Sequence, residues 1–265
     1  MAFTRMDFAE PHAGSQVVSR YLAWRKFESL IRLQAMWFST LAALQDTYEG
    51  TLPKRAFERL NQSHLEEAKN FPGQEWQFAE MAARRTQDLR QMTSVNCWYL
   101  GVEESEHMWS EYAPAADSVM IVSSVNQLDA AFWPGDKGSS LLGRVNYVDF
   151  ETFDLTTYEA SNAAKVIFLK QDQYRTENEL RLSVLNVVVP GRRNQDGSPC
   201  SPALAKGPGQ FDPNRRGLFV PCFLRILISS IVLSPRANAD SKRAVKSVLG
   251  RHGLSFLPVK ESALK

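Results

Sequence analysis

The sequence predicts an α+β fold: a single domain with a mixed, mostly antiparallel sheet and a helical insert near residues 53–92. From residue 95 onward, short segments rich in β-branched and aromatic residues recur, which is typical of strands. Residues 54–70 and 74–92 are instead rich in helix formers, and Phe71-Pro72-Gly73 separates them. The change in periodicity after the two helices therefore predicts the architecture.

The other elements follow in order along the chain. The spacing of Phe27, Leu30 and Ile31 predicts a helix over residues 26–34. In the insert, we expect two sets of side chains to face inward: Phe57, Leu60 and Leu65 from the first helix, and Trp76, Met81 and Leu89 from the second. The expected strands are 20–24, 36–41, 95–100, 118–124, 143–150, 163–170, 178–189, 218–223, 228–233 and 254–259.

The last expected helix has signals at both ends. Asp240 or Ser241 is a suitable N-cap, and Gly253 is a suitable stop signal. Its inner face is Ala244, Val245, Val248 and Leu249.

Composition restricts the class of protein. The 265 residues are 44% hydrophobic and 23% charged, as in an ordinary globular protein. A net charge of +2 does not indicate a nucleic-acid partner, without excluding one, and no apolar run is long enough to span a membrane. We expect a flexible leader at residues 1–16, without a signal peptide, and a single domain over residues 17–265. Three cysteines far apart favour reduced thiols and a cytoplasmic location.

The segment TENELRLSV carries the densest set of charged candidates. On a strand, Leu180 and Leu182 point to the core, while Glu177, Glu179 and Arg181 point to the other face. Two neighbouring carboxylates in a pocket can differ in pKa, which suits acid–base or cation-stabilising chemistry. The alternative, which the spacing alone favours, is the solvated face of an ordinary strand.

Two further groups are candidates. Asp46 and Glu49 lie three residues apart before Gly50, where they can position a ligand hydroxyl or, as the favoured alternative, form a turn capped by Asp46. The block NCWYLGVEESEHMWSEY holds the remaining candidates, with Ser105 expected to cap a helical turn and the aromatic residues expected to be core or pocket. Its candidates are Trp98, Glu104, Ser105, Trp109 and Tyr112.

Several chemistries lack their sequence signals. The four histidines show no HExxH or paired-ligand spacing, so no metal site is predicted. The phosphate-loop, GxGxxG and GxSxG motifs do not occur. The loop at 190–217 is long and rich in proline and glycine, which is typical of functional or disordered loops.

The ordered segments RYLAWRKFESLI, MWFSTLAALQDTYEG, VNCWYLGVEESEHMWSEY, GRVNYVDF and KVIFLKQDQYRTENELRL resemble the bacterial family known as domain of unknown function 2971. The resemblance runs from about residue 18 to residue 190, and ISSIVLSP and GRHGLSFLPVKES resemble that family's C-terminal end. It implies related proteins rather than an activity.

A second resemblance implies chemistry. Arg20, the Phe38-Ser39-Thr40 segment and the Glu177-x-Glu179 pair occur in an order similar to the Arg, Ser-Thr and Glu-x-Glu pattern of ADP-ribosyltransferases. Arg20, with Tyr21 beside it, would bind the pyrophosphate of NAD, and Ser39 would shape the nicotinamide pocket. Glu179 would be catalytic, and Glu177 would select the acceptor.

Three functions remain open. The first is a cytoplasmic NAD-consuming enzyme that modifies a macromolecular acceptor or hydrolyses NAD, as a toxin or phage-defence effector. Here Arg20, Ser39 and Glu179 should share a cleft, with Trp98 and Trp109 nearby for stacking. The second is a non-catalytic binding or regulatory module that contacts a protein partner through loop 190–217. The third is a Mg²⁺-dependent nuclease, with Mg²⁺ held by a site whose residues are Asp46, Glu49, Lys170, Glu177 and Glu179.

Overall fold

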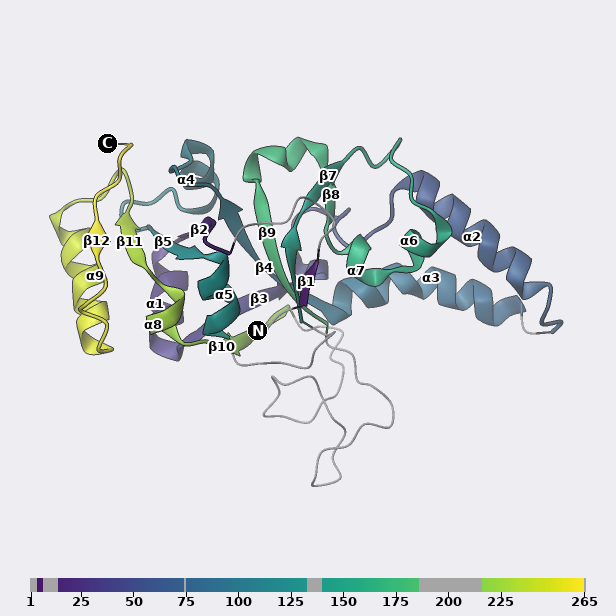
Figure 1. Ribbon diagram of the computed structural model, residues 1–265, viewed down its shortest axis with the longest axis horizontal. Helices are drawn as coiled ribbons and strands as arrows, with labels where there is room; N and C mark the ends of the chain where they lie inside the picture. The colour runs from purple at the N-terminus through teal and green to yellow at the C-terminus, as the bar shows by residue number, and fades with distance from the viewer. Residues whose placement is uncertain (1–3, 7–13, 74, 133–139, 186–215, 265) are drawn as a thin grey trace, which may run out of the picture.

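The computed structural model describes residues 4–6, 14–73, 75–132, 140–185 and 216–264. One ten-stranded sheet dominates this part of the chain, with the order β1-β6-β9-β4-β2-β5-β11-β12 and with β3 pairing both β4 and β10 (Figure 1). Most pairs are antiparallel, so the predicted α+β class is confirmed. The strands of this sheet are β1 (Thr4–Met6), β2 (Val17–Leu22), β3 (Ala35–Thr40), β4 (Thr93–Leu100), β5 (Val119–Ser124), β6 (Ser140–Arg144), β9 (Glu179–Leu185), β10 (Gly217–Pro221), β11 (Ser230–Leu233) and β12 (Val259–Lys260).

A separate pair of parallel strands, β7 (Asn146–Val148) and β8 (Leu169–Gln171), lies beside this sheet. Helices and 3₁₀ turns make the connections: α1 (Trp24–Leu33), η1 (Leu41–Ala43), α2 (Lys54–Ala68), α3 (Glu75–Met92), α4 (Glu106–Tyr112), α5 (Val125–Ala131), α6 (Thr157–Ser161), α7 (Ala163–Val166), η2 (Asp172–Glu177), α8 (Leu224–Leu227) and α9 (Ala239–Arg251). None of the helices in the described residues is both long and apolar enough to cross a bilayer.

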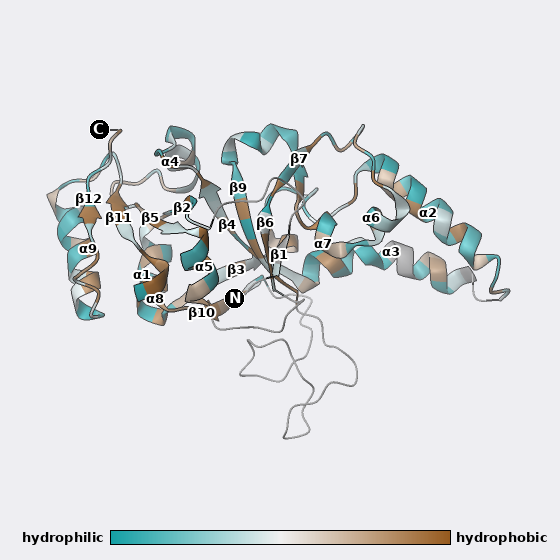
Figure 2. Cartoon of the chain, in the orientation of Figure 1, coloured by the Kyte–Doolittle hydropathy of each residue, from teal (hydrophilic) through white to brown (hydrophobic). Residues whose placement is uncertain are grey.

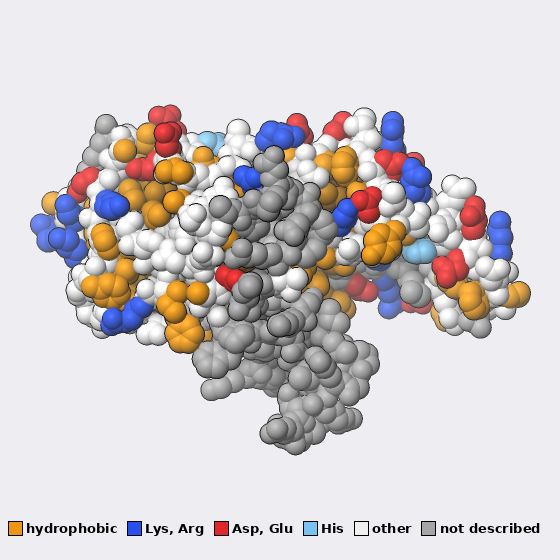
Figure 3. Space-filling view, viewed as in Figure 1, with side chains coloured by type: hydrophobic (Ala, Val, Ile, Leu, Met, Phe, Trp, Pro, Cys, Tyr) orange, Lys and Arg blue, Asp and Glu red, His pale blue; other side chains and the backbone are white. Residues whose placement is uncertain are grey.

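The predicted helical insert is the hairpin of α2 and α3, which extends away from the sheet (Figure 1). Leu60 is buried as expected, but Phe57 and Leu65 are 43% and 64% exposed, so their inward orientation was predicted wrongly. Only a narrow stripe of α2 packs against residues of β7, β8 and α6, which leaves hydrophobic side chains on the hairpin surface (Figure 3). Trp76 on α3 is likewise exposed.

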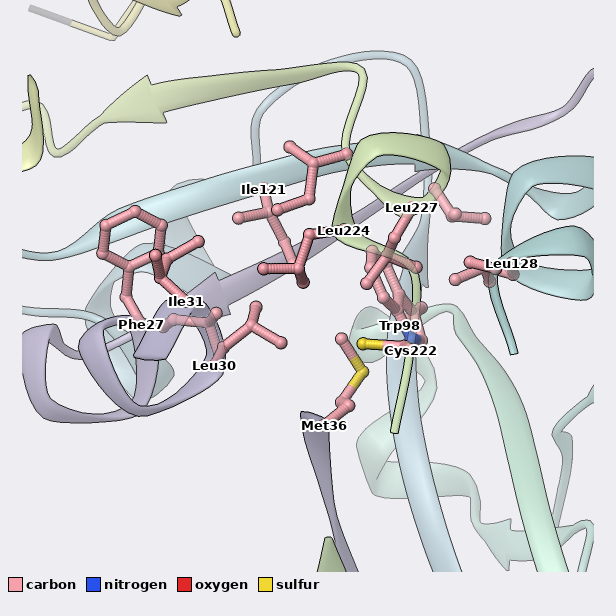
Figure 4. Close-up of a cluster of buried hydrophobic side chains, with 14 of the residues drawn as sticks. Phe27, Leu30, Ile31, Met36, Trp98, Ile121, Leu128, Cys222, Leu224 and Leu227 are labelled. Carbon is pink, nitrogen blue, oxygen red and sulfur yellow. The ribbon is translucent and has the colours of Figure 1, made fainter. Parts of the chain in front are cut away.

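The main hydrophobic core covers one face of the sheet beneath α1, α5, α8 and α9. It joins side chains from α1 and α8 to Trp98 and Ile121 on the central strands (Figure 4). On β9, Leu180, Leu182 and Val184 all belong to this core, which confirms the orientation predicted from their alternation. Coloured by hydropathy, β9 carries both hydrophobic and hydrophilic residues along its length (Figure 2).

Several predicted strands differ in the structure. Residues 163–170 begin as the short helix α7, because the Asn162 side chain accepts a hydrogen bond from the Ala164 amide and caps a helical turn. Residues 143–150 divide between β6 and β7. Helix α8 separates β10 from β11. Part of the expected leader is ordered, because Thr4–Met6 pairs with β6 as β1.

The C-terminal helix is shifted slightly from its predicted start. Asn238 is the N-cap of α9, and Ser241 completes a capping box three residues later. Val245, Val248 and Leu249 are buried as predicted, whereas Ala244 is half-buried. Gly253, with φ of 68°, follows the helix as expected. Of the strand expected at 254–259, only its last residue lies in a strand, β12.

Candidate active site

The second face of β9 carries charged side chains that are as buried as the apolar ones. Arg181 donates two hydrogen bonds to the Glu179 carboxylate, from Nε to Oε1 at 2.6 Å and from Nη2 to Oε2 at 3.1 Å. Its Nη1 donates to the Ile167 carbonyl at 2.7 Å. Arg181 is 0% exposed and Glu179 is 2% exposed. The interpretation of this face as solvated is therefore wrong.

Lys170 on β8 gathers three carboxylates around one ammonium group. Its Nζ lies 2.6 Å from Glu177 Oε2, 3.3 Å from Glu179 Oε2 and 3.3 Å from Glu49 Oε1. Glu49 Oε2 is also 2.5 Å from Arg181 Nη2, an ion pair without hydrogen-bond geometry. We refer to Glu49, Lys170, Glu177, Glu179 and Arg181 as the ionic cluster. Its members come from four separate segments of the chain, and all of them are buried.

The backbone between Glu177 and Glu179 departs from simple strand alternation. Glu177 is the last residue of η2, and Asn178 has a left-handed conformation with φ of 37° and ψ of 59°. The Leu100 amide donates to the Asn178 carbonyl at 2.8 Å, and the Asn178 side-chain amide donates to the Leu100 carbonyl. Asparagine tolerates this conformation better than most residues. Glu177 and Glu179 therefore reach the same ammonium group from different secondary structures.

Glu49 is carried by a tight turn after η1. Asp46 Oδ1 accepts from the Tyr48 amide at 2.9 Å and from Gln171 Nε2 at 3.1 Å. Gly50 closes the turn with φ of 78°, and a Cβ atom there would lie 2.8 Å from Leu41 Cδ1. Asp46 thus shapes the turn, as its capping interpretation predicted, and contacts β8 next to Lys170, whereas Glu49 enters the ionic cluster.

The pKa values of two carboxyl groups in the ionic cluster shift in opposite directions. Burial pushes the pKa of Glu179 upward, but Arg181 and Lys170 outweigh it and lower the pKa to about 2. Burial raises the pKa of Glu49, although Arg181 and Lys170 oppose that change. Lys170 and Arg181 stay charged: burial lowers the pKa of each, but nearby Glu179 and Glu49 raise both above their usual values. Three carboxylates against two cations leave one excess negative charge when all of these groups are ionised.

Three tyrosines surround the ionic cluster. Tyr112, the last residue of α4, donates from its hydroxyl to Glu177 Oε1 at 2.9 Å and is 39% exposed. Burial and Glu177 raise its pKa. The Tyr147 hydroxyl accepts from the Glu179 amide at 2.9 Å, and the Tyr174 ring lies 4.9 Å from Lys170 Nζ. The sequence singled out Tyr112 but missed Tyr147 and Tyr174, because no motif in the sequence marks either tyrosine as a neighbour of Glu179.

Cys97 on β4 is paired with Arg181 and lies on the same face of the sheet. Burial and nearby Glu179 raise the pKa of its thiol well above the ordinary value. A thiol that remains protonated is a poor nucleophile.

Arg20 and Ser39 are not members of the ionic cluster. The pairing of β2 with β4 covers Val18 and Ser19 and ends before Arg20. Burial lowers the pKa of Arg20, and nearby Cys97, Glu179 and Tyr112 oppose that change. The Arg20 guanidinium donates from Nη1 to the Cys97 carbonyl at 2.9 Å. Ser39 pairs with Val95, four residues along β4 from Tyr99, and accepts from Trp37 Nε1. Ser39 therefore lies away from Glu179, whereas Arg20 lies close enough to Glu179 to interact with it electrostatically, and the shared cleft stays a prediction.

The tryptophans and Tyr21 are packing residues. Trp98 is 1% exposed in the main core and donates from Nε1 to Asn96 Oδ1. Trp109 is 4% exposed, and its ring meets the Tyr21 ring edge-on at 4.9 Å. Neither tryptophan offers a free ring face for stacking on a ligand, contrary to the expectation.

The start of α4 is held by hydrogen bonds. Ser105 caps the helix as predicted, accepting from the Met108 amide, and its own amide donates to the Tyr21 hydroxyl at 2.8 Å. Glu104 accepts from Trp109 Nε1 at 2.9 Å and lies outside the ionic cluster. These candidates therefore support α4 rather than contact the cluster.

Two further predictions concern a partner-binding loop and a metal site. Most of loop 190–217, the proposed partner-binding element, lies outside the described residues. Within the residues the structure describes, no group of three His, Cys, Asp or Glu side chains is placed to hold a metal ion. The point where the Glu49, Glu177 and Glu179 carboxylates converge carries the Lys170 ammonium group.

Comparison with known proteins adds no relative. No protein-family model matches the chain, and no curated protein matches it either. The resemblance to domain of unknown function 2971 proteins thus stays a prediction from the quoted segments.

Proposed function

We propose that the ionic cluster is the active site of an enzyme that cleaves an N-glycosidic bond, with the nicotinamide–ribose bond of NAD as the first candidate. The observation that carries the proposal is a buried glutamate, Glu179, kept ionised by Arg181 and Lys170 beside a second glutamate near the surface. An ionised carboxylate in a site shielded from water stabilises a developing oxocarbenium ion.

The reaction assigns separate roles to the two glutamates. As the bond breaks, its electron pair leaves with neutral nicotinamide, and the ribosyl carbon becomes cationic opposite Glu179. Water or an acceptor hydroxyl then attacks that carbon and gives its proton to Glu177. Glu177 suits this role because it is 8% exposed and hydrogen-bonded to the half-exposed Tyr112, at the rim of the ionic cluster.

Charge supports a substrate with a cationic ring. The ionic cluster carries one excess negative charge when all its carboxylates are ionised, and the nicotinamide ring of NAD is positively charged. Arg20 lies close enough to Glu179 to interact with it electrostatically, so the pyrophosphate contact that the resemblance gives to Arg20 stays part of the proposal. Ser39 has no role in it, because its partner on β4 lies four residues from the partner of Glu179.

A non-catalytic function is the second candidate. The observation that favours it is that each charged group of the ionic cluster already has a partner inside the protein. In that case the network has a structural role alone: it fixes how β8, η2 and the turn before Gly50 pack on the sheet.

The test follows free nicotinamide by chromatography after the purified protein is incubated with NAD. Glu177→Gln keeps the shape of the side chain but removes the proton acceptor, and Glu103→Gln, on the exposed loop before α4, is the matched control. Release by the wild type and by the control, lost in Glu177→Gln at unchanged melting temperature, supports the proposal. No release, together with no thermal stabilisation by NAD, overturns it in favour of the non-catalytic function.

A further inference from the structure

Glu104 joins two parts of the molecule that are far apart in sequence. Its Oε2 accepts from Trp109 Nε1 at 2.9 Å and from the Ser262 hydroxyl at 2.6 Å. Its Oε1 accepts from the Ala263 amide at 2.7 Å. One carboxylate therefore ties the start of α4 to the segment that follows β12.

Helix α4 depends on such anchors because it has only seven residues. An isolated helix of that length is not stable in water. Ser105 at its start binds the Tyr21 hydroxyl, and Met108 and Trp109 pack in a small core with Tyr21. Its position on the sheet is thus set by Glu104 and these contacts rather than by its own propensity.

The other end of α4 reaches the ionic cluster. Tyr112 is its last residue, and its hydroxyl bonds to Glu177 Oε1 at 2.9 Å. Glu177 belongs to η2, which is a single short 3₁₀ segment that packs against α4. A change in where α4 lies therefore changes the hydrogen bond that orients Glu177.

We propose that Glu104 is a positioning residue of the ionic cluster, acting through α4 and Tyr112 on Glu177. As a statement about catalysis this rests on the proposed function, whereas the coupling of Glu104 to Glu177 does not. Glutamine at position 104 keeps one strong acceptor where three donors converge, so Glu104→Gln loosens α4 without changing any group of the ionic cluster.

Hydrogen exchange tests the coupling without requiring activity. In Glu104→Gln, we expect the amides of α4 and η2 to exchange at least about tenfold faster, since a hydrogen bond to a charged group typically contributes more free energy than a tenfold change represents. Lys242→Ala is the control, because it removes the contact between Lys242 and Glu261, next to Ser262, and leaves Glu104 untouched. Unchanged protection of α4 and η2 in Glu104→Gln overturns the inference.

A double-mutant cycle separates positioning from a general loss of stability. If Glu104 acts through Tyr112, Glu104→Gln accelerates hydrogen exchange of the η2 amides when Tyr112 is present. In the Tyr112→Phe background, the same substitution changes that exchange rate little. The same four proteins should show the same non-additive pattern in kcat for nicotinamide release. Additive effects on η2 overturn the inference even if the enzyme is active, and an inactive wild type with a non-additive cycle overturns only the proposed function.

Discussion

The two faces of β9 are equally buried but held by different forces. On one face, Leu180 and Leu182 pack in the main core, where attraction is non-directional and follows buried area. On the other, Glu179 and Arg181 are held by directional ion pairs at 2.6–3.1 Å. Burial of charge is favourable only while every partner is present. The comparison shows that burial alone does not distinguish a surface of apolar packing from one that carries a network of charged side chains.

The largest expected effect comes from removing the central cation of the charged face. Arg181→Met keeps most of the side-chain volume but leaves Glu179 and Glu49 with Lys170 as their remaining cation. Breaking a buried ion pair in this way costs about 3–5 kcal/mol. Denaturant unfolding measures it. Wild-type stability in Arg181→Met would mean that the charged face contributes nothing to folding, and the comparison would fail.

Truncating a side chain on the apolar face should lower the unfolding free energy by a similar amount, but independently of pH. Leu182→Ala leaves a cavity in the main core and should cost about 2–5 kcal/mol. Because no titrating group is lost, the change in unfolding free energy should be the same at every pH between mildly acidic and neutral. A pH-dependent change would show that the two faces are coupled through the strand.

The pH dependence of the wild type reports on the charged face. The pKa of Glu179 is lowered in the folded state to about 2, from a usual value of 4.5. Its contribution to stability is therefore present above pH 4.5 and is lost as the pH falls toward 2; at ~1.4 kcal/mol per pKa unit, it is at most about 3–4 kcal/mol. Urea titrations at several pH values measure the slope, which should flatten below pH 4.5 in Glu179→Gln.

Glu49 should act with the opposite sign. Its pKa is raised by burial, so its contribution is greatest below its unfolded pKa and is lost as the pH rises through its folded pKa. Removing the carboxyl with Glu49→Gln should make the protein relatively more stable toward neutral pH than under acidic conditions. A Glu49→Gln curve parallel to the wild-type curve would mean that this carboxyl stays ionised in the folded protein.

The smallest expected effect is at the rim. Tyr112→Phe removes one hydrogen bond to Glu177 from a side chain that is 39% exposed, where water can replace the hydroxyl. The cost should be about 1 kcal/mol or less, measured by thermal and denaturant unfolding. A loss as large as that of Arg181→Met would place Tyr112 among the structural supports of the charged face and not at its rim.

Local patterns predicted much of the fold. Apolar alternation identified the core face of β9, and helix formers on either side of Phe71-Pro72-Gly73 identified the α2–α3 hairpin. Residues 163–170 were misassigned because capping competes with strand propensity. The Asn162 cap and the Thr156–Glu159 capping box hold two helical turns before β8, despite the β-branched residues that follow.

The site could be predicted only in part. Alternation placed Glu179 and Arg181 on one face, but no local pattern shows whether a polar face meets water or a second layer of structure. Here Lys170 on β8 and Glu49, about 130 residues before Glu179, cover that face. The position of Arg20 relative to Glu179 depends on where the pairing of β2 with β4 ends, which a sequence does not reveal.

Asn178, the left-handed residue between the two glutamates, separates a part of the ionic cluster that the sheet holds in place from a part that the sheet does not hold. Glu179 is bound into a ladder shared with β4 and β6, so it cannot shift without moving the sheet. Glu177 is attached through Asn178 to a single 3₁₀ segment whose other residues are mostly exposed. Insertions or substitutions in η2 can thus alter which groups meet Glu179 at the rim while the sheet that supports it stays unchanged. Under the proposed function, acceptor selectivity would diversify at Glu177 independently of the chemistry at Glu179.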